Sequence, residues 1–443
     1  MPYRLLANPF RDNYTISMSQ IRLYNARIAD FSAETPRLIA GELWTRNEQI
    51  TYAGAAREDA GTMRFDREID CRGNVLLPGF KNAHSHAAMV FLRSLADDLP
   101  LQRWLTEQVF PFEDLLTPDD IRVLVRLGCM EMLTSGITAM FDMYFFREAA
   151  AEAAVDVGMR TVFCNVGGPA EKAAAEYERF NHYHPLISDC MGTHAEYTAT
   201  EEQLDALIGL TNELKAPFCL HLHETAAEVA GCIERYGVRP LELLERKGAF
   251  NYGGTGYHLV HLDERDLEIL KTHGIHAVTC PGSNTKLASG VAPIEEMQAR
   301  GIEIGIGTDG AASNNCLDMF REMFLVTGLQ KLRHGADACD ALSVLRMACV
   351  GGAHAMYLNH CDALEAGKQA DLVMIDLHRP NMQPENHILK NIVYSGSKEN
   401  VALTMVAGKV LYERGTFLTV SDPERVYRDA AAVIARMRGT LGR

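Results

Sequence analysis

The chain has 443 residues, enough for one large α/β barrel with an accessory domain or for two or three smaller domains. Hydrophobic residues make up 47% of it, which is typical of a folded protein with a substantial core. The formal net charge of −15 argues against a nucleic-acid-binding surface, which needs clustered lysine and arginine, and against an acidic polymer as substrate.

The cysteines and the absence of long apolar runs indicate the compartment. There are eleven cysteines, an odd number with no C-x-x-C pair, which is typical of reduced thiols in a cytoplasmic protein. Residues 1–20 contain no apolar core of the kind found in signal peptides, and no run approaches the roughly 18 apolar residues that span a bilayer. We therefore expect a cytoplasmic protein without membrane contact.

Segments with the character of β-strands occur near both ends of the chain, at residues 21–28, 48–54, 64–71, 370–376 and 401–411. Two strand-rich ends around a different centre predict one small β-sandwich, formed jointly by residues 1–77 and 363–420. Residues 421–443 follow a helical pattern and predict a terminal helix docked on the body.

Short apolar runs alternate with helical segments between these ends. We expect eight buried strands, at residues 75–82, 136–143, 161–166, 190–194, 217–223, 255–262, 276–280 and 303–308. Runs that are apolar on both faces and separated by helices are what a parallel sheet covered on both sides requires. Eight of them predict a TIM-like (β/α)8 barrel over residues 78–362, with catalytic groups at the C-terminal ends of its strands.

Polar side chains stand at the ends of several of these strands. His84 and His86 end the first strand, and residues i and i+2 of a strand face the same way, so both imidazoles can reach one metal ion. Three later strands, the fifth, sixth and eighth, end in His221 with Glu224, in His261 and in Asp309. One His-x-His pattern is weak evidence, because short motifs occur by chance and three occur here. Polar groups at several strand ends together predict a metal site.

The remaining histidines and one cysteine receive structural interpretations. His182 and His184 lie in a polar helix-to-loop context and are interpreted as surface residues. His223 shares the parity of a predicted ligand, and we expect it to support the site from behind. His258 has the opposite parity to its predicted catalytic neighbour and is expected to pack among helices. Cys280 is expected to be a buried, inert thiol.

Three imidazoles and one carboxylate form a catalytic kind of ligand set, because they leave one position open for water. Here these ligands are His84, His86, His221 and Asp309. A metal ion in such a site lowers the pKa of that water toward neutrality. Glu224, outside the ligand set, is then free to carry protons to the substrate. The H-x-E signature with P-C-x-x-C of the cytidine-deaminase fold is absent, and so is H-E-x-x-H.

These motifs together resemble the amidohydrolase superfamily, in its aminohydrolase branch. The residues that carry the resemblance are Pro78–His86, His221 with Glu224, His261, and Thr308–Asn315. The nearest likeness is to the methylthioadenosine/S-adenosylhomocysteine deaminases, and it covers essentially the whole chain. The resemblance implies one divalent ion on the four ligands, expected to be Zn²⁺, although Fe²⁺ and Mn²⁺ suit such a set. It also implies that Glu224 is the proton shuttle, Asp309 the base toward the attacking water and His261 the histidine beside it.

The resemblance extends in part to the substrate. Trp104 and His194 match substrate-contacting positions, and Glu113 matches a glutamate that holds the ribose hydroxyls. The chain departs from the family at Gly192–Tyr197 and Thr279–Pro281, where the usual residues are replaced. Near Gly167–Pro169 no arginine aligns with the one that grips an amino-acid carboxylate, and this loss weakens the expected affinity for a homocysteine tail.

The expected function is hydrolytic deamination of a 5′-modified adenosine, such as methylthioadenosine, 5′-deoxyadenosine or S-adenosylhomocysteine, to the inosine product and ammonia. Two alternatives remain. One keeps the site but acts on another amino-heterocycle, of guanine, pterin or triazine type, or on a cyclic amide. The other is a non-catalytic scaffold, which the complete ligand set disfavours. A small molecule is the expected partner, without nucleic acid or membrane, and a homo-oligomer is compatible with the sequence.

Overall fold

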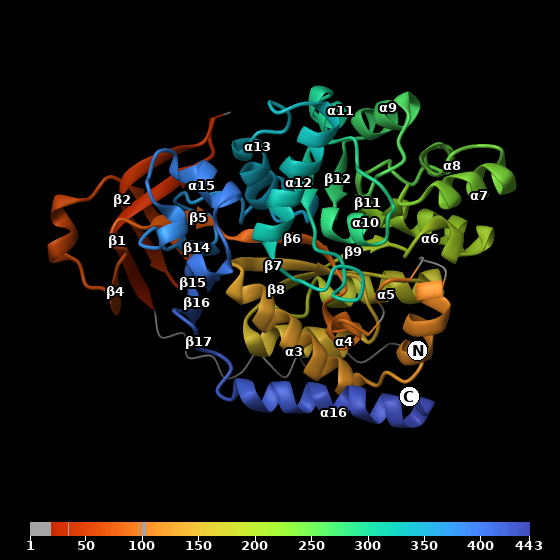
Figure 1. The fold of residues 1–443 in the computed structure, drawn as a ribbon, viewed down its shortest axis with the longest axis horizontal. Coiled ribbons are helices and arrows are strands. Elements are labelled where there is room, and N and C mark those ends of the chain that lie inside the picture. Colours follow the sequence, from red (N-terminus) through yellow and green to blue (C-terminus); the bar gives the residue numbers. More distant parts are fainter. Residues whose placement is uncertain (1–18, 34, 96, 100–102) are drawn as a thin grey trace.

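Two sheets form the framework of the computed structural model, which describes residues 19–33, 35–95, 97–99 and 103–443. Residues 1–18, on which the expected absence of a signal segment rests, lie outside this range. One sheet is an eight-stranded parallel barrel and the other is a nine-stranded mixed sheet beside it (Figure 1). The predicted fold class, a TIM-like barrel with a smaller β domain from both chain ends, is confirmed. Among the described residues, no helix is long and apolar enough to cross a membrane.

The barrel strands follow one another in chain order. They are β6 (Phe80–Ser85), β7 (Ile137–Asp142), β8 (Arg160–Cys164), β9 (Ile187–Gly192), β10 (Phe218–Leu222), β11 (Gly254–His258), β12 (Ile275–Thr279) and β13 (Ile304–Ile306). Each overlaps one predicted strand, with two differences. The run 75–82 divides at Gly79 into β5 (Val75–Pro78) of the mixed sheet and β6, and the sixth strand ends at His258, four residues earlier than expected.

The last barrel strand lies beside the first, and side chains join them. Asn82 donates from Nδ2 to Thr308 Oγ1 at 2.7 Å, and its Oδ1 accepts the backbone N–H of Thr308 at 2.8 Å. The backbone N–H of Asp309 donates to the carbonyl of His84 at 3.0 Å. The chains approach so closely that a Cβ on Gly307 would lie 2.8 Å from the Cβ of His84, which explains a glycine there. Closing the barrel therefore brings Asp309 to His84.

Helices cover the outside of the barrel (Figure 1). They are α3 (Pro118–Thr134), α4 (Arg147–Val157), α5 (Ala170–Phe180), α6 (Glu201–Leu214), α7 (Ala226–Tyr236), α8 (Pro240–Arg246), α9 (Glu264–Thr272), α10 (Pro281–Lys286), α11 (Ile294–Ala299), α12 (Met319–His334), α13 (Ala341–Arg346) and α14 (Gly352–Ala355). Several begin at capping boxes, with Thr117, Thr200, Thr225 and Asp263 as N-caps of α3, α6, α7 and α9. Such caps satisfy backbone N–H groups that the first helical turn leaves unpaired.

Strands from both ends of the chain form the mixed sheet, in the order β17-β16-β15-β14-β5-β1-β2-β3, with β4 beside β1 (Figure 1). Their bounds are β1 (Gln20–Asp30), β2 (Arg37–Arg46), β3 (Gln49–Gly54), β4 (Arg67–Asp70), β14 (Leu372–Ile375), β15 (Val401–Val406), β16 (Lys409–Glu413) and β17 (Thr416–Phe417). The two ends meet where β14 pairs antiparallel with β5. The buried ion pair of Arg160 with Asp371, at 2.7 Å, joins this sheet to the barrel.

Shorter helical segments and the terminal helix complete the chain. They are η1 (Glu58–Thr62), η2 (Ala87–Leu92), η3 (Trp104–Val109), α2 (Phe110–Glu113), η4 (Glu196–Thr198), η5 (Met347–Gly351), η6 (Pro380–Met382), α15 (Ile388–Tyr394), η7 (Lys398–Asn400) and α16 (Pro423–Leu441). Helix α16 lies along the lower edge in Figure 1 and buries Val426, Ala430, Val433 and Met437, a stripe at helical spacing. The domain boundaries drawn from the sequence stay predictions.

A histidine away from the strand ends generates a prediction about stability. His354 in α14 hydrogen-bonds Asp362 through Nε2 at 2.9 Å and Glu303 through Nδ1 at 2.5 Å, and these bonds raise its pKa to about 9. Because the folded pKa lies above the unfolded value near 6.5, the stabilisation is complete below pH 6.5 and is lost as the pH rises through about 9. We expect His354→Gln to abolish this loss, which is on the order of 1 kcal/mol for a half-exposed group.

Urea unfolding of both proteins between pH 6 and pH 10, at constant ionic strength, measures this difference. His182→Gln, on an exposed histidine, is the matched control and should keep the wild-type profile. An equal loss of unfolding free energy in wild type and His354→Gln would contradict the assignment.

Candidate metal centre

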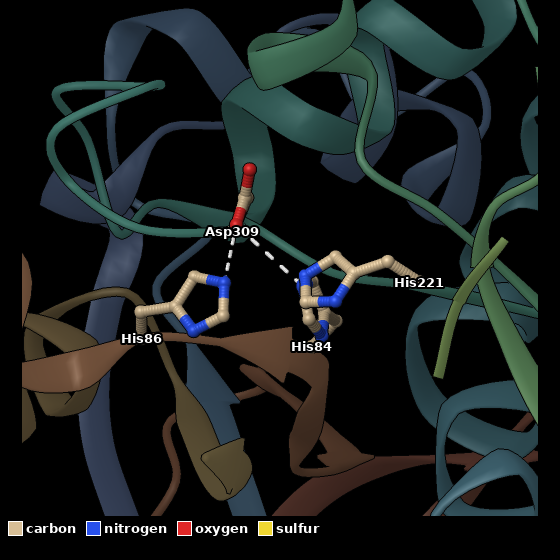
Figure 2. A group of neighbouring side chains, drawn as sticks. All are labelled: His84, His86, His221 and Asp309. Carbon is tan, nitrogen blue, oxygen red and sulfur yellow. Dashed lines mark ion pairs between the residues drawn. The ribbon is translucent and has the colours of Figure 1, made fainter. Parts of the chain in front are cut away.

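Four side chains from three barrel strands converge at the C-terminal end of the barrel. His84 lies in β6, His86 directly follows it, His221 lies in β10, and Asp309 follows β13. One ligand atom from each lies within 4.8 Å of the corresponding atoms of the other three. Figure 2 shows the three imidazoles gathered below the carboxylate. The structure thus brings together all four ligands predicted from the sequence, which form the candidate metal centre.

The protonation of two of these histidines suits metal binding. His86 donates from Nδ1 to the carbonyl of Met143 at 2.6 Å, and His221 donates from Nδ1 to the carbonyl of His194 at 2.7 Å. A carbonyl only accepts, so each ring carries a proton on Nδ1, and Nε2 is the nitrogen that remains to bind a metal. This is the arrangement by which proteins orient histidines toward a metal.

His84 provides a separate test of fit. Its side chain is fully buried, stacks on Tyr257 with ring centroids 4.2 Å apart, and has no hydrogen-bond partner at either ring nitrogen. A buried polar group without a partner is costly unless a ligand satisfies it. The unpaired nitrogen, together with the N₃O donor set of the cluster, fits a divalent ion such as Zn²⁺.

Asp309 is held firmly from its far side. Its Oδ1 lies 3.2 Å from His86 Nε2 and 3.5 Å from His84 Nε2, as the dashed lines in Figure 2 indicate. Its Oδ2 accepts hydrogen bonds from Ser283 Oγ at 2.6 Å and Ser313 Oγ at 2.8 Å. Burial alone would raise the pKa of Asp309, but its contacts with His84 and His86 hold it well below the usual range. The carboxylate is therefore ionised and oriented.

Two further histidines pack against the ligand rings. The centroid of His194 lies 4.3 Å from that of His221, and burial lowers the pKa of His194 to about 4. His258 stacks on His221 at 5.4 Å, meets His84 edge-on at 5.5 Å, and bonds Asn284 Oδ1 through Nδ1 at 2.9 Å. His194 therefore lies against a ligand ring, and its contact with substrate stays a prediction. His258 was not predicted for the site and is an addition to it.

The prediction that His258 packs among helices was wrong. It assumed that the sixth strand continues to Leu262 with regular alternation, but β11 ends at His258. His258 and Leu259 have φ values of +72° and +49°, so the backbone turns there and points His258 toward the ligands. His261, predicted for that position, instead bonds the carbonyl of Ser289 through Nε2 at 2.9 Å. The only sequence feature that could have identified His258 is its place at the end of an apolar run. Using it would have required knowing that the strand ends there.

Glu224, which follows β10 and the ligand His221, is partly buried, and burial raises its pKa. The loop that carries it is fixed by Glu228, which accepts the backbone N–H groups of His223 and Glu224 at 2.7 Å each. His223 faces away from the ligands: its Nδ1 bonds the carbonyl of His261 at 3.1 Å, and its Nε2 accepts from the N–H of Leu241 at 3.2 Å. His223 therefore braces the neighbouring loop, and Glu224 stays available for chemistry.

The predicted substrate residues differ in their surroundings. Trp104 in η3 is buried, and its Nε1 has no hydrogen-bond partner. Glu113, the last residue of α2, accepts a hydrogen bond from the phenol of Tyr144 at 2.6 Å.

Comparison with known proteins agrees with this geometry. Residues 75–411 match the amidohydrolase family. The 5-methylthioadenosine/S-adenosylhomocysteine deaminase of Nitratidesulfovibrio vulgaris (strain Miyazaki F) is 41% identical over 384 residues, which cover 84% of this chain and 86% of that protein. The protein of the same description from Desulforudis audaxviator is 39% identical over 408 residues, covering 90% and 95%.

Among solved structures, an adenosine deaminase from Xanthomonas campestris with bound zinc has a TM-score of 0.89 and 32% identity, over 95% of this chain and 99% of that one. The similarity thus extends through both sheets and is not limited to the barrel. This chain belongs to the amidohydrolase family.

Proposed function

We propose that this protein is a metal-dependent deaminase that hydrolyses the amino group of the adenine ring in a 5′-modified adenosine, giving the inosine product and ammonia. The observation that carries the proposal is the cluster of His84, His86, His221 and Asp309, with the partly buried acid Glu224 close after His221 in the chain. Relatives at about 40% identity described as 5-methylthioadenosine/S-adenosylhomocysteine deaminases support the substrate class.

The proposed resident ion is Zn²⁺ on these four ligands. The N₃O donor set and the unpaired nitrogens of His84 support a divalent ion, and the zinc bound in the Xanthomonas campestris deaminase supports its identity. When bound, such an ion lowers the pKa of a water molecule and makes it available for attack at neutral pH.

Glu224 and Asp309 would move the protons of the reaction. Because burial raises its pKa, the Glu224 carboxyl can hold a proton and deliver it to the ring nitrogen next to the amino-bearing carbon. Asp309, kept ionised by its neighbours, can accept a proton from the attacking water. The new carbon–oxygen bond forms as the ring nitrogen is protonated. The proton that Asp309 took from the water then passes to the amino group, the carbon–nitrogen bond breaks to release ammonia, and the proton of the new hydroxyl group returns to Glu224 as the carbonyl forms.

We assign to His258 the role that the sequence resemblance gave to His261, namely holding the attacking water. Asn284 Oδ1 binds the Nδ1 of His258, which leaves Nε2 of this ring for another partner. Its packing against His84 and His221 supports this assignment. Trp104, Glu113 and His194 are proposed to bind the substrate, with Glu113 accepting hydrogen bonds from the ribose hydroxyls.

Ammonia release from a substrate panel tests the activity. Zinc-loaded protein should deaminate at least one of adenosine, 5′-methylthioadenosine, 5′-deoxyadenosine and S-adenosylhomocysteine. Removing the metal with a chelator should abolish the reaction, and Zn²⁺ should restore it, because the ion activates the water. If all four nucleosides stay intact while a guanine, pterin or triazine loses its amino group, the substrate assignment is wrong.

Replacing the proton carrier should separate catalysis from metal binding. Glu224→Gln is expected to lower kcat by about 10² to 10⁴, because general acid–base catalysis is worth that much, and to keep a full complement of metal. His86→Ala should lose both its activity and its bound metal. Glu234→Gln, the same substitution on an exposed residue of α7, is the matched control for activity. Metal loss in Glu224→Gln, measured by elemental analysis, would contradict a role outside the ligand set.

The two histidines after β11 can be compared directly. His258→Gln is expected to lower kcat by about 10² or more, on the scale of losing a group that acts only in the transition state. His261→Gln should lower kcat by at most a few-fold, because the His261 side chain contacts a loop carbonyl. The reverse order of effects, measured by steady-state kinetics on zinc-loaded proteins, would restore the assignment made from the sequence.

A further inference from the structure

One hydrogen bond connects the proposed sugar-binding glutamate to the barrel. The phenol of Tyr144, directly after β7, donates to Glu113 Oε1 at 2.6 Å. Tyr144 is only 5% exposed, so water competes little with this bond. A hydrogen bond to an ionised carboxylate is about twice as strong as one between neutral groups. The contact therefore limits where the Glu113 carboxylate can lie.

The bond occupies one carboxylate oxygen and leaves the other free. Among the described residues, no second side chain or backbone N–H donates to Glu113. Its Oε2 can therefore accept hydrogen bonds from a bound molecule. Neutral hydroxyl groups are suitable donors, because the tyrosine hydroxyl already donates to one of the two carboxylate oxygens.

The segment that carries Tyr144 also holds the candidate metal centre. The carbonyl of Met143 accepts the Nδ1 proton of His86 at 2.6 Å, and the backbone N–H of Met143 donates to Ser85 at 3.1 Å. Asp142 Oδ1 accepts the backbone N–H of Ala87 at 2.7 Å. The ring of Tyr144 lies 6.1 Å from that of His86. Three consecutive residues thus orient a metal ligand at one end and Glu113 at the other.

We propose that Tyr144 is a positioning residue that sets the distance between Glu113 and the metal centre, and that this distance makes the enzyme selective for ribonucleosides. The inference rests on the proposed deaminase function. A ribonucleoside with its hydroxyls on Glu113 Oε2 places its amino-bearing ring carbon at the ligand cluster. A substrate without these hydroxyls makes no hydrogen bond to Glu113, so the position of Glu113 does not help to place its reacting carbon. Correct placement of the reacting carbon then favours reaction of the ribonucleoside.

Comparing adenosine with 2′,3′-dideoxyadenosine tests the proposal, because the two differ only in the hydroxyls that Glu113 would hold. Wild type should have the higher kcat/KM for adenosine. Tyr144→Phe should lower kcat/KM for adenosine about ten-fold or more, mainly through KM, which corresponds to losing a hydrogen bond to a charged group. Its kcat/KM for the dideoxynucleoside should stay within about two-fold of wild type.

Two further variants make the result specific. Glu113→Gln should lose the preference for adenosine, and adding Tyr144→Phe to it should cost little more, because both act on one contact. Tyr252→Phe, on an exposed tyrosine outside the site, is the matched control. Metal content, measured for each variant, should equal that of wild type.

The outcomes are distinguishable. An equal loss with both nucleosides in Tyr144→Phe, or additive losses in the double variant, would show that Tyr144 acts on the barrel and not through Glu113. An unchanged kcat/KM for both nucleosides in Tyr144→Phe would show that Tyr144 does not position Glu113. A wild type without preference between the two nucleosides would overturn the selectivity, and a wild type that deaminates neither nucleoside nor the other adenosines would overturn the proposed function itself.

Discussion

The closing contact of the barrel is the constraint on which the site depends. The backbone N–H of Asp309 donates to the carbonyl of His84, so the last strand lies against the first at the level of the ligands. Asn82 and Thr308 secure the same junction with two side-chain hydrogen bonds. Residues more than 220 positions apart thereby become neighbours. A metal centre built across this junction is complete only when the barrel has closed.

Backbone carbonyls organise the site as much as side chains do. Met143 and His194 each accept the Nδ1 proton of a ligand histidine, and each follows a different strand. These bonds hold a proton on Nδ1 of each ring and turn Nε2 toward the cluster. Burial by itself opposes the ionisation of Asp309, but the contacts with His84 and His86 outweigh it and keep the carboxylate ionised. The same segment that carries Met143 continues into Tyr144, so the carbonyl that binds His86 and the phenol that binds Glu113 share one support.

Agreement between sequence and structure was good for the four ligands and failed where the sixth strand ends earlier than expected. Alternation placed His84 and His221 correctly, because both lie inside β6 and β10. It failed for His258, where two consecutive left-handed residues rotate the side chain toward the ligands. It also gave no sign of Tyr144, whose contact with Glu113 joins segments 31 residues apart. Local periodicity carries no information about such backbone turns or about long-range contacts.

The sequence by itself determined the architecture and the ligand set. Eight doubly apolar runs indicate a barrel, and His84, His86, His221 and Asp309 at strand ends indicate a metal site, since both follow from spacing along the chain. Only the tertiary structure decided which histidine stands beside the ligands and how Glu113 is held. Those outcomes depend on where strands stop and on hydrogen bonds between distant segments, which exist only in the folded chain.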